Sequence, residues 1–496
     1  MSETQRYILL PQQGIRAMDA ATRAALTELP AASSTGAILE TTYAPAGGAS
    51  VAVIDSISDD GAKLVDMSNE AAELTNASPA PVRAVPVVYY DNPDPQPLFL
   101  DTSSITEAHA LVSIEIKCSD ASTGAGVSGA RVVAFTDFEA RTGASGTTGA
   151  DGTVRLNLPD IGIERLYIFP PDGYWGAFRR ALSTGSDHHL TVHPIDLSVP
   201  DVVRHYYGNS RFNRLAGVTA GVIDTGVGPH DHLNIIGGRN TVTGEPADEW
   251  QDGGTHGTHV AGLIGANGDA PAGLFGVAPG IGMHAYRVFG ANARGASNYA
   301  ILKAMIIAGL DGCDIINLSL GGGPADNIVF EAVQDAREQG MLVVVAAGNN
   351  GRRRVEFPAA YEGAIAVSAM GREGTFPHGA LEEADILRPP ASPNDPAEFL
   401  AAFSNVGPEI SITGPGVGTL STLPGNRYGP KSGTSMAAPA VAGAAASLLS
   451  QDNFIFNMPR DRSRANAIAR LLQTSCVQRG FGLPFEGFGL PDPTLV

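Results

Sequence analysis

The stretch CDIINLSLGGGPADNIVFEAVQDAREQGMLVVVAAGNNG, residues 313–351, contains the pattern of a strand, a helix and a second strand in one run. Its segments IINLSL and MLVVVAA are almost continuously apolar, which is typical of strands that are buried on both faces. The segment between them, IVFEAVQDAREQ, has apolar residues at helical spacing and ends at Gly340. This stretch therefore predicts a parallel sheet that is covered by helices on both faces.

The same pattern extends on the N-terminal side. GVTAGVIDTG (217–226) and MHAYRVFG (283–290) read as further strands, and YAILKAMIIAGLDG (299–312) reads as a helix. Ligands of such sheets bind at the carboxyl ends of the strands. We expect those ends to carry Asp224, the run from Ser319 to Gly322, and Asn349.

Three residues offer the groups that nucleophilic acyl transfer requires. Asp224 lies in VIDTGV, His256 in GGTHGTHVAG, and Ser435 heads GTSMAAPAVAGAAASLL (433–449), a predicted helix of small residues. A serine attacks a carbonyl group only when a base takes its proton, and a carboxylate holds that base in the right tautomer. The oxyanion that forms needs donors, for which Asn349 and the backbone N–H of Ser435 are the candidates.

The blocks VIDTGV, HGTHVAG, INLSLGG, VVAAGNNG and SGTSMAAP resemble, in this order, the signature blocks of the subtilisin-like serine proteases, or subtilases. The resemblance covers residues 201–496. It implies that Asp224 orients His256, that His256 acts as general base and then as acid, that Ser435 is the nucleophile, and that Asn349 stabilises the oxyanion. It also implies a group of residues that pair with the substrate backbone and wall the primary pocket: Ser319, Leu320, Gly321 and Gly322.

The residue before Phe357-Pro358 is the candidate for substrate selection. In the family this block closes the bottom of the primary pocket, and the register places Glu356 at the pocket floor. A partly desolvated carboxylate there would favour Lys or Arg before the scissile bond. The alternative is that Glu356 pairs with an arginine of the run Arg352–Arg354 and leaves an apolar pocket.

Residues 1–92 read as a βαββαβ unit with a ferredoxin-like pattern. Its expected strands are YILLP (7–11), ILETTY (38–43), SVAVID (50–55) and VRAVPVVYY (82–90), and its second helix carries the stripe Leu64, Met67, Ala71 and Leu74. This pattern resembles the subtilase propeptide, which assists folding and inhibits the enzyme by laying its last strand in the active cleft.

Two further segments separate the ends of the chain. The proline-rich residues 93–108 read as a linker, and residues 109–197, with short alternating strands between turns, as a small β-sandwich. Within residues 201–496, the subtilisin-like domain, residues 371–399 look like an insertion that is either a lid, an exosite or a solvated loop.

Composition excludes some partners. The net charge of −19 argues against nucleic acid, and the sequence contains no apolar run long enough to cross a membrane. We expect no required cofactor. A structural calcium ion is an alternative, because Ala266-Asn267-Gly268-Asp269 could supply oxygen ligands, although His232 replaces the aspartate that many relatives carry.

We therefore expect a cytoplasmic serine endopeptidase that acts on proteins or peptides and is regulated by its own N-terminal domain, in the manner of a zymogen that processes itself. The cytoplasmic expectation depends on the lack of a signal-peptide core and on three widely spaced cysteines; a non-standard export route is the alternative. The alternative function is a latent, mainly self-processing protease that serves as a protein-binding or regulatory module.

Overall fold

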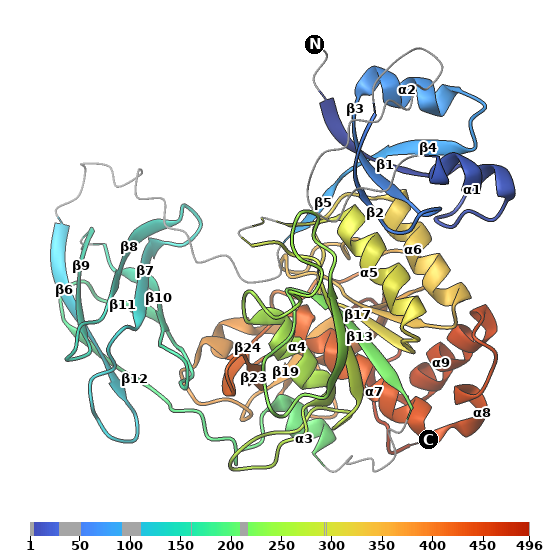
Figure 1. Ribbon diagram of the computed structural model, residues 1–496. Helices are drawn as coiled ribbons and strands as arrows, with labels where there is room; N and C mark the ends of the chain where they lie inside the picture. Colours follow the sequence, from blue (N-terminus) through green and yellow to red (C-terminus); the bar gives the residue numbers. More distant parts are fainter. Residues whose placement is uncertain are drawn as a thin grey trace.

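The computed structural model describes residues 4–28, 51–91, 111–159, 161–208, 217–291, 293 and 295–495. These residues form three units, which we call the N-terminal unit (4–91), the middle unit (111–192) and the C-terminal unit (202–491). In Figure 1 the N-terminal unit lies against helices of the C-terminal unit, and the middle unit projects to one side.

The N-terminal unit is an antiparallel sheet with two helices. The strand order is β2-β3-β1-β4, and Tyr7 of β1 pairs with Val65 of β3 and with Pro86 of β4. The elements are β1 (Thr4–Pro11), α1 (Ala20–Thr27), β2 (Ala52–Ser56), β3 (Lys63–Ser68), α2 (Asn69–Ala77) and β4 (Val82–Pro86), followed by the short strand β5 (Tyr89–Asp91).

The predicted stripe in this unit is wrong in its first half. Leu64 and Met67 lie in β3, and only the following residues belong to α2. The helix begins after Ser68, whose hydroxyl accepts a hydrogen bond from the N–H of Ala71 at 3.2 Å. Because β3 runs directly into α2, apolar residues of the strand and of the helix together have the spacing of a single helical face. The predicted strand 38–43 lies outside the described residues.

The middle unit consists of two sheets that enclose one apolar cluster, with the orders β11-β10-β7-β8 and β12-β6-β9. Ile116 of β6 and Leu166 of β10 are fully buried in this cluster. The strands are β6 (Leu111–Asp120), β7 (Arg131–Asp137), β8 (Thr142–Thr147), β9 (Thr153–Pro159), β10 (Ile163–Phe169), β11 (Ala177–Leu182) and β12 (His188–Val192).

The C-terminal unit is built on a nine-stranded sheet in the order β14-β15-β13-β17-β18-β19-β21-β20, with β22 beside β19. Its pairs from β14 to β19, and β19 with β22, are parallel, which confirms the predicted α/β class. The strands are β13 (Thr219–Asp224), β14 (Ile235–Asn240), β15 (Gly282–Arg287), β17 (Ile315–Leu318), β18 (Leu342–Ala346), β19 (Ala364–Arg372), β20 (Ile386–Ala391), β21 (Glu398–Ala401) and β22 (Ile410–Pro415).

Helices cover both faces of this sheet. Val344 of β18 packs in the cluster that contains residues of α4 and α7, whereas Val343 and Val345 pack in the cluster that contains residues of α5 and α6. Alternate side chains of one strand thus reach opposite cores, which explains why these strands are continuously apolar. The helices are α3 (Val202–Tyr207), α4 (His256–Gly265), α5 (Asn298–Leu310), α6 (Asn327–Glu338), α7 (Thr434–Gln451), α8 (Asn453–Phe456), α9 (Arg462–Thr474) and α10 (Leu483–Glu486).

Short elements complete the unit. They are β16 (Gly295–Ser297), the 3-10 helix η2 (Leu381–Asp385), the hairpin of β23 (Thr419–Leu423) and β24 (Arg427–Lys431), and the antiparallel pair of β25 (Cys476–Val477) and β26 (Leu490–Pro491). Among the described residues, no helix has both the length and the apolar character needed to cross a membrane.

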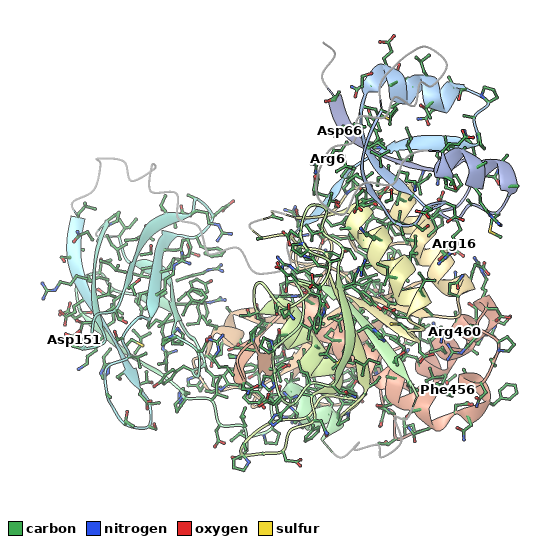
Figure 2. All side chains as sticks on the ribbon, in the orientation of Figure 1. Arg6, Arg16, Asp66, Asp151, Phe456 and Arg460 are labelled. Carbon is green, nitrogen blue, oxygen red and sulfur yellow. The ribbon has the colours of Figure 1, made fainter. Side chains whose placement is uncertain are left out.

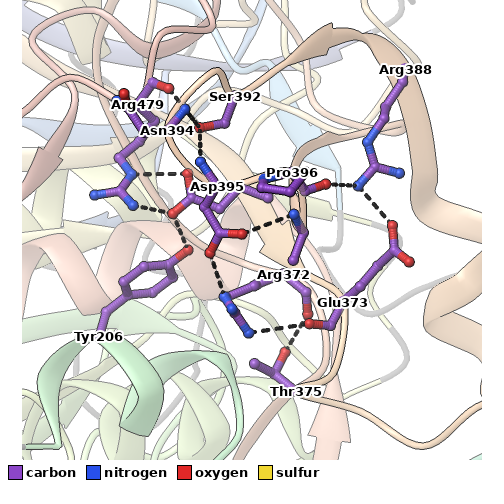
Figure 3. A network of polar contacts seen from close by, with 12 residues as sticks. Tyr206, Arg372, Glu373, Thr375, Arg388, Ser392, Asn394, Asp395, Pro396 and Arg479 are labelled. Atoms are coloured by element: carbon purple, nitrogen blue, oxygen red, sulfur yellow. Dashed lines mark hydrogen bonds and ion pairs between the residues drawn. The ribbon is translucent and has the colours of Figure 1, made fainter.

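The segment 371–399 is integrated into the main sheet, because β20 and β21 extend its edge. Figure 3 shows the polar contacts that anchor it. The buried carboxylate of Glu398 accepts hydrogen bonds from Arg479 and from the hydroxyl of Tyr206, and Arg372 pairs with Asp395 at 2.8 Å. These contacts tie the segment to α3 and to the C-terminal end of the chain.

Candidate active site

Adjacent strand ends bring the predicted residues together. Asp224 ends β13 and Ser319 directly follows β17, and the parallel register pairs Ile223 with Leu318, so the two residues lie on neighbouring strands. The next strand, β18, ends three residues before Asn349. Since neighbouring strands are about 4.8 Å apart, these ends form a single polar edge.

His256 and Asp224 form a buried pair. Nδ1 of His256 lies 2.8 Å from Oδ1 and 3.0 Å from Oδ2 of Asp224, and both side chains are almost fully buried. A carboxylate at Nδ1 keeps the proton there and leaves Nε2 with its lone pair. Nε2 of His256 is buried and has no hydrogen-bond partner among the described residues, so it is free to accept a proton.

The N-terminus of α4 is stabilised by Asp252, a residue that the sequence analysis did not identify. Asp252 accepts hydrogen bonds from the backbone N–H and the hydroxyl of Thr258, at 2.8 and 2.5 Å, and from the hydroxyl of Thr225 at 2.8 Å. It thereby caps the helix that begins at His256, whose own N-cap residue, Thr255, makes no side-chain cap. Burial raises the pKa of Asp252. The sequence feature that could have identified Asp252 is the presence of an aspartate shortly before the histidine block.

Ser435 lies in the first turn of α7, where backbone N–H groups lack acceptors within the helix. Its Oγ donates a 3.4 Å hydrogen bond to the carbonyl of Ser319, and the hydroxyl of Ser319 donates to the carbonyl of Ser435 at 2.8 Å. The nucleophile candidate is thus fixed to the strand end that neighbours Asp224. Pro439 falls inside α7 near its N-terminus.

Asn349 is oriented by the residue next to Ser435. Its Oδ1 accepts hydrogen bonds from the N–H and the hydroxyl of Thr434, at 2.8 and 3.0 Å. With Oδ1 engaged, the amide group Nδ2 is left as the donor. Asn349 is exposed, so this donor is accessible from solvent.

The predicted backbone-binding run is occupied by the chain itself. The N–H of Asp91 donates to the carbonyl of Gly321 at 2.9 Å, and β5 pairs with β16 in antiparallel register. Tyr90, between these two contacts, is fully buried, and a Cβ on Gly323 would lie only 2.5 Å from its ring. The groove between β16 and the Ser319–Gly322 run therefore already holds an extended strand.

A histidine ring fills space at the alternative calcium site. The ring of His232 lies between Gly268 and Gly273, where a Cβ at either position would come within 2.4 and 2.5 Å of it, and Nδ1 of His232 hydrogen bonds to the hydroxyl of Tyr428. Calcium prefers six to eight oxygen ligands. In the part of the chain that is described, no group of three or more His, Cys, Asp or Glu side chains is arranged to hold a metal ion.

A buried carboxylate–imidazole pair and a serine at a helix N-terminus, both at the carboxyl edge of one parallel sheet, are the groups that a serine hydrolase uses. Comparison with known proteins specifies the class. The subtilase family profile matches residues 216–489, and the chain belongs to this family as a subtilisin-like serine endopeptidase.

Relatives are similar over the same region. The chain is 40% identical to subtilisin BL of Lederbergia lenta over 238 residues, which cover 48% of this chain and 78% of that protein. It is 40% identical to an alkaline protease of Alkalihalobacillus alcalophilus over 238 residues, 48% of this chain and 55% of that protein. It is 38% identical to subtilisin DY of Bacillus licheniformis over 242 residues, 48% of this chain and 78% of that protein.

Proposed function

We propose that this endopeptidase cleaves peptide bonds through an acyl-enzyme on Ser435, with His256 as the base and Asp224 as its orienting carboxylate. The observation that carries the proposal is the buried His256, which has Asp224 on Nδ1 and an open Nε2. His256 Nε2 takes the proton of Ser435 as Oγ attacks the substrate carbonyl. It then returns this proton to the leaving amine, and a water molecule repeats the sequence to release the acyl group.

The oxyanion that forms during attack is stabilised by Nδ2 of Asn349 and by the backbone N–H of Ser435. The two contacts from Thr434 to Oδ1 of Asn349 support this role, because they fix the amide before substrate arrives. Donors that are already oriented need no reorganisation during the reaction.

We further propose that the N-terminal unit (within residues 1–92) is a ferredoxin-like, propeptide-like inhibitor of the subtilisin-like domain (201–496), from which it is separated by the linker 93–108 and the β-sandwich 109–197. Its strand β5 in the groove supports this proposal. So do its ion pairs with the helices below: Arg16 with Asp335 of α6, at 2.6 and 2.9 Å, and Asp55 with Lys303 of α5, at 2.7 Å. Arg16 is labelled in Figure 2.

One observation favours the alternative, a latent protease that acts mainly on itself. Ile8, Leu10 and Leu64 of the N-terminal unit share an apolar cluster with residues of α5 and α6. An interface with an apolar core of this kind resembles a permanent contact more than a transient one.

A serine-directed fluorophosphonate tests both functions. The intact protein should be labelled, whereas Ser435→Ala and His256→Ala should not, and Ser450→Ala, in the same helix, should be labelled like the wild type. Labelling of Ser435→Ala at the wild-type level would refute the assignment. Intact mass of the wild type, compared with that of Ser435→Ala, separates the alternatives: self-cleavage without turnover of added peptides supports the latent protease.

A further inference from the structure

The carboxylate of Glu356 lies at the wall of the substrate groove, against backbone that carries no side chains. A Cβ on Gly348 would lie 2.6 Å from its Oε2, and a Cβ on Gly321 would lie 3.0 Å from the same atom. Gly321 forms an isolated β-bridge with Asp91, and Gly348 directly precedes Asn349. The carboxylate therefore lies between the backbone-binding run and the oxyanion donor.

The register of β5 indicates which substrate residue would face Glu356. Asp91 pairs with Gly321 in antiparallel register, so a peptide that continued in this register would place its next residue but one opposite Ser319. The carbonyl of Ser319 accepts a hydrogen bond from the hydroxyl of Ser435, so this strand end lies beside the nucleophile. We therefore take the substrate residue opposite Ser319 to be the one that immediately precedes the scissile bond.

Side chains alternate along an extended strand, so that residue points to the same side as Asp91. The carboxylate of Asp91 turns toward Gly322, where a Cβ would lie 2.3 Å from its Oδ2. The charge of Asp91 acts on Glu356 and contributes to raising the pKa of its carboxyl. The side chain before the scissile bond thus shares a face with Glu356.

Among the residues that the structure describes, no cation neutralises this carboxylate. The guanidinium of Arg352 donates to the carbonyls of Leu387, Pro389 and Leu400, and within the described residues no arginine or lysine forms an ion pair with Glu356. The side-chain amide of Asn350 donates a hydrogen bond to it. Burial is the largest cause that raises the pKa of Glu356, while the bond from Asn350 lowers it.

We propose that Glu356 selects substrates with arginine or lysine immediately before the scissile bond. This inference rests on the proposed role of Ser435. A guanidinium or ammonium group at the end of a long side chain supplies the charge that the half-buried carboxylate lacks, and an arginine can bind it through two hydrogen bonds. The surplus of acidic residues in the whole chain attracts such substrates as well.

The test uses the full-length protein and two fluorogenic peptides that differ only in arginine or citrulline before the scissile bond. Citrulline keeps the shape of arginine and lacks its charge. Rates are normalised to the fraction of protein that a simple fluorophosphonate labels. We expect wild-type kcat/KM to favour arginine on the order of 10–100-fold, and this ratio to fall to near one in Glu356→Gln. Glu362→Gln, which removes an exposed carboxylate on the same segment, should keep the wild-type ratio.

The outcomes separate the two proposals. Absence of fluorophosphonate labelling on the wild type overturns the role of Ser435 and this inference with it. Labelling together with equal rates for arginine and citrulline, or with turnover of neither peptide, overturns the inference alone. A preference for arginine that persists in Glu356→Gln assigns the selection to another residue and also overturns it. Because the carboxylate must be ionised, the wild-type ratio should also rise with pH.

Discussion

We predict that Glu382 makes the stability of the protein depend on pH. It lies in η2, is only 5% exposed, and its Oε2 has no hydrogen-bond partner among the described residues. Its side chain, the ring of Trp175 of the middle unit and the ring of Phe376 all lie close to Gly418, where a Cβ would be 3.1, 3.4 and 3.3 Å from them. Burial raises the pKa of Glu382 from 4.5 to about 7.

The expected change in stability follows from this pKa. The folded protein holds a proton on Glu382 over a range where the unfolded chain has lost it, so the free energy of unfolding falls as pH rises from about 4.5 to about 7. A difference of about 2.5 pKa units corresponds to roughly 3 kcal/mol. Glu382→Gln is neutral at every pH and should lose this part of the pH dependence.

The assay is urea unfolding followed by tryptophan fluorescence, at pH 5 and pH 8, in a Ser435→Ala background that prevents self-digestion. Relative to its own parent, Glu382→Gln should gain about 3 kcal/mol between the two pH values. Glu362→Gln should have the same free energy of unfolding as the parent at both pH values. If Glu382→Gln and its parent show the same pH dependence, Glu382 is ionised in the folded protein and the reasoning is refuted.

The other predictions concern catalysis, inhibition and stability. Asn349→Ala should still react with a fluorophosphonate but lose on the order of 10²–10³-fold in kcat, the cost known in this family for removing one oxyanion donor; an unchanged kcat would exclude it from the oxyanion site. Arg16→Ala combined with Arg83→Ala removes two ion pairs to α6 and should raise peptidase activity about tenfold at low salt, with no rise if the N-terminal unit does not inhibit. Asp252→Ala should lower the free energy of unfolding by about 1–3 kcal/mol, measured by urea unfolding, because α4 loses its cap. A chelator should leave the thermal midpoint unchanged, since His232 fills the space between Gly268 and Gly273; a clear fall in the midpoint would contradict this.

The main sheet could be predicted because burial on both faces leaves a strong trace in the sequence. Val343 and Val345 face one core and Val344 faces the other, so no position of β18 can be polar. The residues at the strand ends were predictable for the same reason, since polar side chains stand out after such runs. Asp224 and Asn349 are found where this argument places them.

Weaker patterns were missed. Strand β8 has the sequence TGASGT, which contains no large apolar residue, and it forms because it pairs with β7. The pairing of Asp91 with Gly321 joins residues 230 positions apart in sequence, and its partners are backbone groups that any residue type supplies. The role of Asp252 likewise depends on which helix it meets. Such contacts form only once the fold is assembled, and they leave no local pattern in the amino-acid sequence.

The helix that carries Ser435 has a consequence for sequence variation. Every residue of α7 from Thr434 to Leu449 is buried, and glycine or alanine occupies half of these positions. An ordinary surface helix has a solvent face on which substitutions accumulate without effect. Here sixteen successive residues have no such face, so tolerated changes should show no helical period. We expect few substitutions at any position of this segment. On the outer faces of α6 and α9, by contrast, we expect substitutions to be common.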